Sequence, residues 1–164
     1  MAIHDVISVV EESVPFAEWK AQHPDAYLAH VFVMVEGTVT DEWQVGYVDG
    51  GKVIPFKLSG DKVLAGSEEK IFKKPGESVH KLDAEAVSVE VIDAVEMART
   101  HCEEKFPHDP VKKAICILQD LPDEGAVWNI TFVTLTIKTI NVRVDAASKE
   151  IRKAEVVEFF QWGK

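Results

Sequence analysis

The sequence predicts an α+β fold built from two tandem copies, each a helix packed on a four-stranded antiparallel β-meander. The chain matches itself at an offset of 85 positions, which indicates a duplicated unit. Each copy opens with apolar residues spaced three and four apart, which is typical of a helix face. Alternating apolar residues separated by turn signals follow, which is typical of strands. We therefore divide the chain into a first copy at 1–66, a linker at 67–85 and a second copy at 86–164.

The internal repeat extends without a gap over the first 49 residues of the chain. Ten positions are identical in the two copies: Val6 and Val91, Ile7 and Ile92, Val10 and Val95, Glu11 and Glu96, Glu18 and Glu103, Lys20 and Lys105, His23 and His108, Ala29 and Ala114, Trp43 and Trp128, Val48 and Val133. Unrelated sequences would share about one residue in sixteen to twenty. The period is longer than that of solenoid repeats, so it indicates duplication of a small domain.

A helix is expected at the start of each copy. The first would bury an apolar face formed by six residues: Ile3, Val6, Ile7, Val10, Val14 and Ala17. Pro15 interrupts this face because proline lacks the backbone donor of a helix interior. Either the helix bends there, or Ser13 caps a second short helix with Pro15 in its first turn. In the second copy we expect Ser88 to cap an uninterrupted helix that runs to Phe106.

Strand signals follow each helix. First strands are expected at 27–35 and 111–119, followed by polar loops at 36–42 and 120–126. Trp43 and Trp128 would then open the second strands. A tight hairpin is predicted at 49–51, with further strands at 53–58 and 62–65. In the second copy the alternation changes parity, which places a turn near 134–137 and a last strand at 151–160.

Composition limits the classes of partner. The chain has 164 residues, 46% of them hydrophobic, and a net charge of −10, which disfavours nucleic acid and anionic membrane surfaces. No run of 18 apolar residues could span a membrane. We expect a cytoplasmic protein because the first residues lack the basic segment of a signal peptide. An extracytoplasmic chain whose leader has been removed would look the same, and this alternative stays open.

The second copy resembles the PepSY domain family. The resemblance rests on residues 95–98 in the helix (VEMA), 128–132 in a strand (WNITF), and 140–146 with 148–151 in the last hairpin (INVRVDA and SKEI). The usual glycine of that hairpin is absent, since Lys149 and Glu150 occupy the turn. The first copy matches more weakly, through 43–47 and 53–58. The resemblance implies a PepSY/cystatin-like fold and a non-enzymatic binding or peptidase-inhibiting module, often extracytoplasmic.

Histidines and cysteines are the residues that could carry chemistry. His23 and His108 are equivalent in the repeat, and Asp25 and Asp109 lie close to them in sequence. They predict either helix ends, where an imidazole caps free carbonyls, or metal or acid–base sites. Cys102 and Cys116 are expected as two buried thiols, and a disulfide would require the helix to pack directly over the strand. No phosphate-binding loop or nucleophile motif occurs, so we predict no catalytic residue, metal or cofactor.

The aromatic residues give the binding hypothesis. Trp43, Tyr47, Trp128 and Phe132 either form the core beneath each helix or flank an aromatic groove for a protein or peptide. Trp162, with the phenylalanines at 159 and 160, could seal a homodimer contact. The leading hypothesis is a non-enzymatic binding module that uses a sheet edge or a groove. The alternatives are a small-ligand binder or enzyme that uses a cavity between helix and sheet, and an oligomer-forming structural protein.

Overall fold

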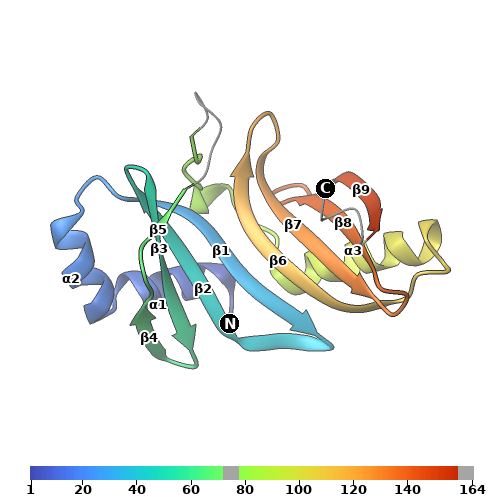
Figure 1. Cartoon of the computed structure of the whole chain (residues 1–164), viewed down its shortest axis with the longest axis horizontal. Coiled ribbons are helices and arrows are strands. Elements are labelled where there is room, and N and C mark those ends of the chain that lie inside the picture. The colour runs from blue at the N-terminus through green and yellow to red at the C-terminus, as the bar shows by residue number, and fades with distance from the viewer. Residues whose placement is uncertain (72–77, 159–164) are drawn as a thin grey trace.

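Three α-helices lie on one face of a single antiparallel sheet in the computed structural model, which describes residues 1–71 and 78–158 (Figure 1). The helices are α1 (Ile3–Glu11), α2 (Val14–Gln22) and α3 (Val91–Lys105), with a short 3₁₀ helix at Ala84–Ala86. The strands are β1 (Tyr27–Glu36), β2 (Thr38–Asp49), β3 (Lys52–Ser59), β4 (Lys62–Ala65), β5 (Glu69–Lys70), β6 (Val111–Leu121), β7 (Gly125–Thr134), β8 (Lys138–Asp145) and β9 (Ile151–Glu158). The predicted α+β class is confirmed.

The two copies share one sheet. Its strand order is β4-β3-β2-β1-β6-β7-β8-β9, and β5 adds to the outer side of β3. Each copy therefore contributes a four-stranded meander, and the first strands of both copies, β1 and β6, pair antiparallel at the centre. The uncovered faces of the two copies do not pack on each other, because they are the two halves of one continuous face.

The joint between the copies has twofold pseudosymmetry. Phe32 lies opposite Ile117 in the β1–β6 pairing, and these two residues occupy equivalent positions of the repeat. Val31 pairs with Leu118, and Val33 pairs with Cys116. At the offset of 85, Val31 is equivalent to Cys116 and Val33 to Leu118, so a twofold rotation would exchange these two pairs. The pseudo-dyad thus passes between Phe32 and Ile117, at the centre of the sheet.

The first helical segment is broken into two helices rather than bent. Ser13 caps α2 by accepting a hydrogen bond from the Phe16 amide at 3.4 Å, and Pro15 lies in the first turn of that helix. The break rotates the second helix, so that Phe16 is buried while Val14 is 68% exposed. The expected continuous apolar face is therefore wrong beyond Val10, because the spacing of three and four does not continue across a break.

The second copy keeps one uninterrupted helix, α3, but Ser88 does not cap it. Glu90 occupies the cap position, and the Ser88 hydroxyl donates instead to the carbonyl of Ala147 at 3.0 Å. The Glu90 carboxylate accepts from the Ile3 amide at 2.8 Å, at the start of the first helix. An acceptor from the second copy thus satisfies a free N-terminal amide of α1.

Two turns are tighter than the sequence indicated. The polar loop expected at 36–42 is largely strand, because Gly37, with φ of 76°, turns the chain directly from β1 into β2. The loop expected at 120–126 shortens in the same way to residues 122–124. The turn expected near 134–137 is confirmed, with Ile137 at φ of 60° and β8 beginning at Lys138. The segment expected as a linker contains β5 and the 3₁₀ helix.

Apolar residues between the helices and the sheet form one core that runs through both copies. Both cysteines lie in it as free, buried thiols, one on α3 and one on β6. Burial raises the pKa of Cys102 to about 11 and that of Cys116 to about 12, so both thiols are protonated at neutral pH. The expectation of two buried thiols is confirmed.

The hairpin between β8 and β9 is organised by Asp145. Its carboxylate accepts from the amides of Ala147 and Ser148 at 2.8 and 2.9 Å and from the Arg152 guanidinium at 2.7 Å. Burial alone would raise the pKa of Asp145, but the hydrogen bonds from Arg152, Ser148 and Ala147 outweigh it and lower the pKa to about 2. These bonds hold the turn, and Lys149 takes the positive φ of 66° there.

We predict that Asp145→Asn lowers the free energy of unfolding by about 2 kcal/mol at pH 7, because one pKa unit corresponds to about 1.4 kcal/mol. A carboxyl group with a lowered pKa stabilises the fold above its unfolded pKa and loses this effect as the pH falls through the folded value. The difference between variant and wild type should therefore shrink between about pH 4 and pH 2. Urea unfolding at several pH values measures it, and a difference independent of pH would contradict this role.

We predict that Trp128→Phe is more destabilising than Trp43→Phe, although the two residues are equivalent in the repeat. The Trp128 indole is fully buried and donates to the carbonyl of Val89 at 2.8 Å, so the variant leaves a buried acceptor without its partner. The expected losses are about 2–3 kcal/mol for Trp128→Phe and about 1 kcal/mol for Trp43→Phe. Chemical denaturation of both variants checks this, and equal losses would show that the hydrogen bond contributes nothing.

Candidate functional site

The four aromatic residues proposed for binding all face the helices. Trp43 is 5% exposed, Tyr47 3%, and Trp128 and Phe132 are fully buried. They form the core beneath the helices, which is the first of the two roles considered for them. A partner could not reach these side chains in this structure, so any binding surface lies elsewhere.

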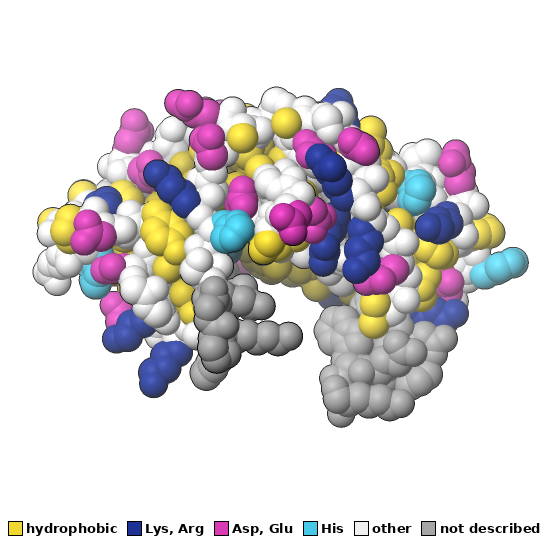
Figure 2. All heavy atoms as spheres, turned by 90° about the horizontal axis from the view of Figure 1, so that it is seen from above, with side chains coloured by type: hydrophobic (Ala, Val, Ile, Leu, Met, Phe, Trp, Pro, Cys, Tyr) yellow, Lys and Arg dark blue, Asp and Glu magenta, His cyan; other side chains and the backbone are white. Residues whose placement is uncertain are grey.

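The described helices all lie on one face of the sheet, and we call the other face, which carries none of them, the open face. One row of side chains crosses this face from strand to strand. Each residue of the row is the cross-strand partner of the next, from β3 through β2, β1, β6 and β7 to β8. This central row consists of Lys57, Gln44, Phe32, Ile117, Asn129 and Arg143. Phe32 and Ile117 are half-buried although no helix or strand of residues 1–71 and 78–158 covers them. The described part of the molecule is hollowed along this side, at the lower edge of Figure 2.

The chemistry of the central row follows the pseudo-dyad. From the centre outward, each copy presents an apolar side chain, then an amide and then a cation. The amides Gln44 and Asn129 are equivalent in the repeat, and Lys57 and Arg143 differ from equivalence by one position. Met34 and Ile115, which pair beside the central row, widen the apolar centre. The open face therefore has an apolar middle with hydrogen-bonding and cationic groups on both sides.

Several of the polar side chains are held in place by their neighbours. The Asn141 amide donates to the Asn129 side-chain oxygen at 2.7 Å, so Asn129 keeps its own amide hydrogens free to donate. Arg143 donates to the Glu124 carboxylate at 2.8 Å, with side chains 28% and 23% exposed. These contacts restrict the rotamers of Asn129 and Arg143, so less side-chain entropy is lost when a partner binds.

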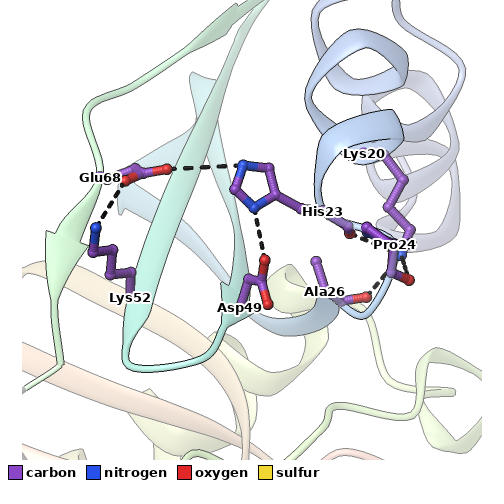
Figure 3. A network of polar contacts seen from close by, with 7 residues as sticks. All are labelled: Lys20, His23, Pro24, Ala26, Asp49, Lys52 and Glu68. Atoms are coloured by element: carbon purple, nitrogen blue, oxygen red, sulfur yellow. Dashed lines mark hydrogen bonds and ion pairs between the residues drawn. The ribbon is translucent and has the colours of Figure 1, made fainter.

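His23 lies in a different polar network, at the end of α2 (Figure 3). Its Nδ1 contacts the Asp49 carboxylate at 2.6 Å, and its Nε2 lies 3.9 Å from Glu68, which also approaches Lys52 at 3.5 Å. The indole of Trp19 stacks on the imidazole with ring centroids 4.6 Å apart. The network joins α2, the β2–β3 hairpin and the segment before β5, so it can fasten the helix to the sheet.

The carbonyls of the cap residue and of the chain just after α2 accept from Lys20 rather than from the histidine ring. The Lys20 ammonium donates to the carbonyls of His23, Pro24 and Ala26 at 3.4, 2.7 and 3.0 Å (Figure 3). The expectation that the imidazole caps these carbonyls is therefore wrong for the first copy. The lysine side chain reaches past the helix end to these carbonyls and also places a cation at the negative end of the helix dipole.

His108 has no equivalent network. It is exposed, and the position that corresponds to Asp49 is Thr134, whose hydroxyl bonds within the following turn. The nearby Asp109 instead accepts from the Thr136 hydroxyl at 2.7 Å, and this bond, together with the charge of Lys138, lowers the pKa of Asp109. The two histidines that match in sequence thus have different surroundings. Within residues 1–71 and 78–158, no group of three metal-ligating side chains converges.

Sequence reasoning overlooked other contacts. The Tyr47 hydroxyl donates to the Glu11 carboxylate at 2.7 Å. In the second copy Phe132 replaces the tyrosine, so Glu96 has no such donor. His80 contacts Asp120 at 2.9 Å beside the open face, and His30 lies on that face. One signal for the central row was present in the sequence. Gln44 and Asn129 are amides at equivalent positions of the repeat, and each stands between two apolar residues of an expected strand.

Comparison with known proteins supports the fold alone. No family model matches the chain, and no curated protein does. The chain is similar to the crystal structure of a "putative lipoprotein" from Clostridium difficile 630, with 19% sequence identity and a TM-score of 0.60 over 96% of this chain and 93% of that chain. Among the described helices, none has the length and apolar character needed to cross a membrane.

We predict that the His23–Asp49 contact contributes a coupling energy of about 0.5–1 kcal/mol to folding at pH 6, because both side chains are partly exposed. A double-mutant cycle with His23→Gln and Asp49→Asn measures it by urea unfolding. The coupling should fall in 0.5 M NaCl, since salt screens partly exposed pairs. A coupling of zero at low salt would show that the network does not fasten α2 to the sheet.

Proposed function

We propose that the protein is a non-catalytic binding module that holds a protein or peptide partner on the open face. The central row is the observation that carries this proposal, because it places half-buried apolar side chains in the middle of a sheet face that none of the described helices covers. Interfaces commonly combine an apolar centre with a polar rim. The amides and cations on both sides of Phe32 and Ile117 supply such a rim.

The chemistry of the face indicates the kind of partner. An apolar side chain of the partner would contact Phe32, Ile117 and their neighbours Met34 and Ile115. Backbone carbonyls or carboxylates on either side would accept from the Asn129 amide and from Lys57. The partner would thus be a protruding apolar segment with acceptors around it, and its two ends would meet similar groups because the face is pseudosymmetric.

The finer assignment rests on the resemblance of the second copy to PepSY domains. We propose that both copies are PepSY-like repeats of the PepSY/cystatin-like type, and that the partner is a peptidase or a peptide. The strand order of two meanders and the position of the helices on one face support this assignment. The residues that carry the resemblance, including Asp145, organise turns and core in the second copy, so they support a fold rather than an activity.

The location and the oligomeric state remain proposals as well. We propose a cytoplasmic location, with an extracytoplasmic chain whose leader has been removed as the alternative. The description of the similar structure as a lipoprotein is the observation that favours the alternative. The homodimer contact expected at Trp162 and the phenylalanines at 159 and 160 lies outside the described residues.

Two double variants of the same charge test the binding face. Phe32→Lys/Ile117→Lys places two cations at the centre of the open face, whereas Val14→Lys/Leu135→Lys places them at exposed positions away from it, where the residues are 68% and 65% exposed. We expect the first variant to capture a partner from the native lysate about tenfold less well than wild type or more weakly still, because central interface residues dominate binding energy. The second variant should capture it normally.

Quantitative mass spectrometry of the captured proteins measures the outcome, with circular dichroism to confirm that both variants are folded. Equal capture by the two variants would place the binding surface elsewhere. A partner that is a peptidase, and whose activity falls on binding wild type but not on binding the open-face variant, would support the inhibitory role.

A further inference from the structure

A pocket of about 700 Å³ opens at one end of the open face, beyond the central row. Its floor is formed by strands β1, β2, β3 and β6, and the segment 78–80 lies along one side. This volume lies within the range of about 300–1,000 Å³ in which proteins bind small molecules. The pocket lies outside the central row, so its occupant is a separate question from that of the protein partner.

The described walls of the pocket are anchored. The Tyr27 hydroxyl donates to the carbonyl of Val79 at 2.7 Å, and His80 contacts the Asp120 carboxylate at 2.9 Å. On the other side, the Ile71 amide donates to the carbonyl of Gly51 at 2.9 Å. These bonds tie the described residues before and after the segment 72–77 to the sheet, so these sides of the pocket exist without a ligand.

His30 lies on the floor with its imidazole flat against the neighbouring strand. Gly46, its cross-strand partner, makes room for the ring, since a Cβ atom at position 46 would lie 2.1 Å from Cε1 of His30. Burial lowers the pKa of His30, and the charge of Glu69 opposes this only in part, so the ring is neutral at pH 7. A neutral imidazole presents one donor and one acceptor.

The polar groups on this floor are free within the described chain. Neither ring nitrogen of His30 has a hydrogen-bond partner among residues 1–71 and 78–158, and the same holds for the side-chain amide of Gln119, which lies opposite His30 across the β1–β6 joint. Polar groups that line a pocket and have no hydrogen-bond partner in the protein can form hydrogen bonds with a ligand. The remaining floor and walls include the apolar side chains of Val48, Val53 and Leu121.

We propose that this pocket binds an uncharged small molecule that has a flat apolar body and a group able to donate and accept hydrogen bonds, such as a carboxamide or a neutral heterocycle. His30 and Gln119 hold the polar group, and the valines and Leu121 contact the body. An anionic ligand is disfavoured because Glu69 places a negative charge near His30. A cationic ligand is disfavoured because Asp120, the one carboxylate among the described lining residues, is already occupied by His80.

Three probes of the same size separate these charge classes: benzamide, benzoate and benzylamine. Each is titrated into the full chain at pH 7.5, and the Cε1 proton of His30 is followed by NMR. We expect benzamide to shift this signal with saturation and the two charged probes to shift it little. Equal responses to all three probes, or benzamide shifts as large at the exposed His108 as at His30, would overturn the proposal.

Substitutions locate the binding groups. His30→Leu should weaken benzamide binding about three- to tenfold, because it removes one hydrogen-bonding partner, whereas His108→Leu should leave it unchanged. The methyl signals of Val48 and Val53 report binding in these variants. Unchanged affinity in His30→Leu would overturn the role of the imidazole.

Gly46→Ala tests the same site without touching a ligand-binding group. The new Cβ atom would force the His30 ring off the strand and into the pocket, so benzamide binding should be lost. The matched control is Gly51→Ala, where nothing lies within 4 Å of the added atom and the backbone carbonyl that accepts from Ile71 is kept. If Gly46→Ala is folded and binds benzamide as well as the control does, the assigned position of the ligand is wrong. If Gly46→Ala does not fold, His30→Leu decides.

Discussion

The antiparallel pairing of β1 with β6 is the constraint on which the rest of this structure depends. Six consecutive residue pairs join the copies, from His30 with Gln119 to Val35 with Ala114. Because side chains alternate along a strand, a shift of one residue would move the apolar set of one copy to the opposite face of the sheet. The observed register places Val31 and Val33 beneath the helices together with Cys116 and Leu118. It therefore produces one core and one open face at the same time.

The repeat made much of each copy predictable, and it did so through local signals. Helical spacing, the Asp49–Gly50–Gly51 hairpin and the parity changes after Phe132 located most elements to within a few residues. The break before α2 was predicted as one of two outcomes. The burial of Phe16 and the exposure of Val14 were not predicted, because the apolar spacing of one helix does not define the buried face of the next. The joining of the copies could not be read from the sequence, since strand pairing between distant segments leaves no periodic pattern.

The candidate site was less predictable than the fold, for a related reason. Trp43 and Trp128 stood out because they are large and repeated, yet large repeated aromatic residues are what a duplicated core requires. The polar positions of the open face follow the repeat, as Gln44 and Asn129 do, whereas the polar groups of the pocket lie where the copies differ. His30 and Gly46 form a cross-strand pair in the first copy, and Ile115 and Thr131 form the equivalent pair in the second. Conservation of the repeat thus marks the scaffold, while divergence marks the places where the first copy has acquired its own chemistry.

The two ends of the sheet differ in a way that limits how the molecule can assemble. At the first end, β4 and β5 are four and two residues long and lie on either side of Pro55, so they offer a short, interrupted edge. At the other end, β9 presents eight residues, and in the part of the chain that the structure describes it is the longest free edge. Growth of a sheet into a fibre requires both ends to accept strands. Within the described residues only the β9 end offers a long edge, so the geometry of the sheet disfavours open-ended growth through both ends.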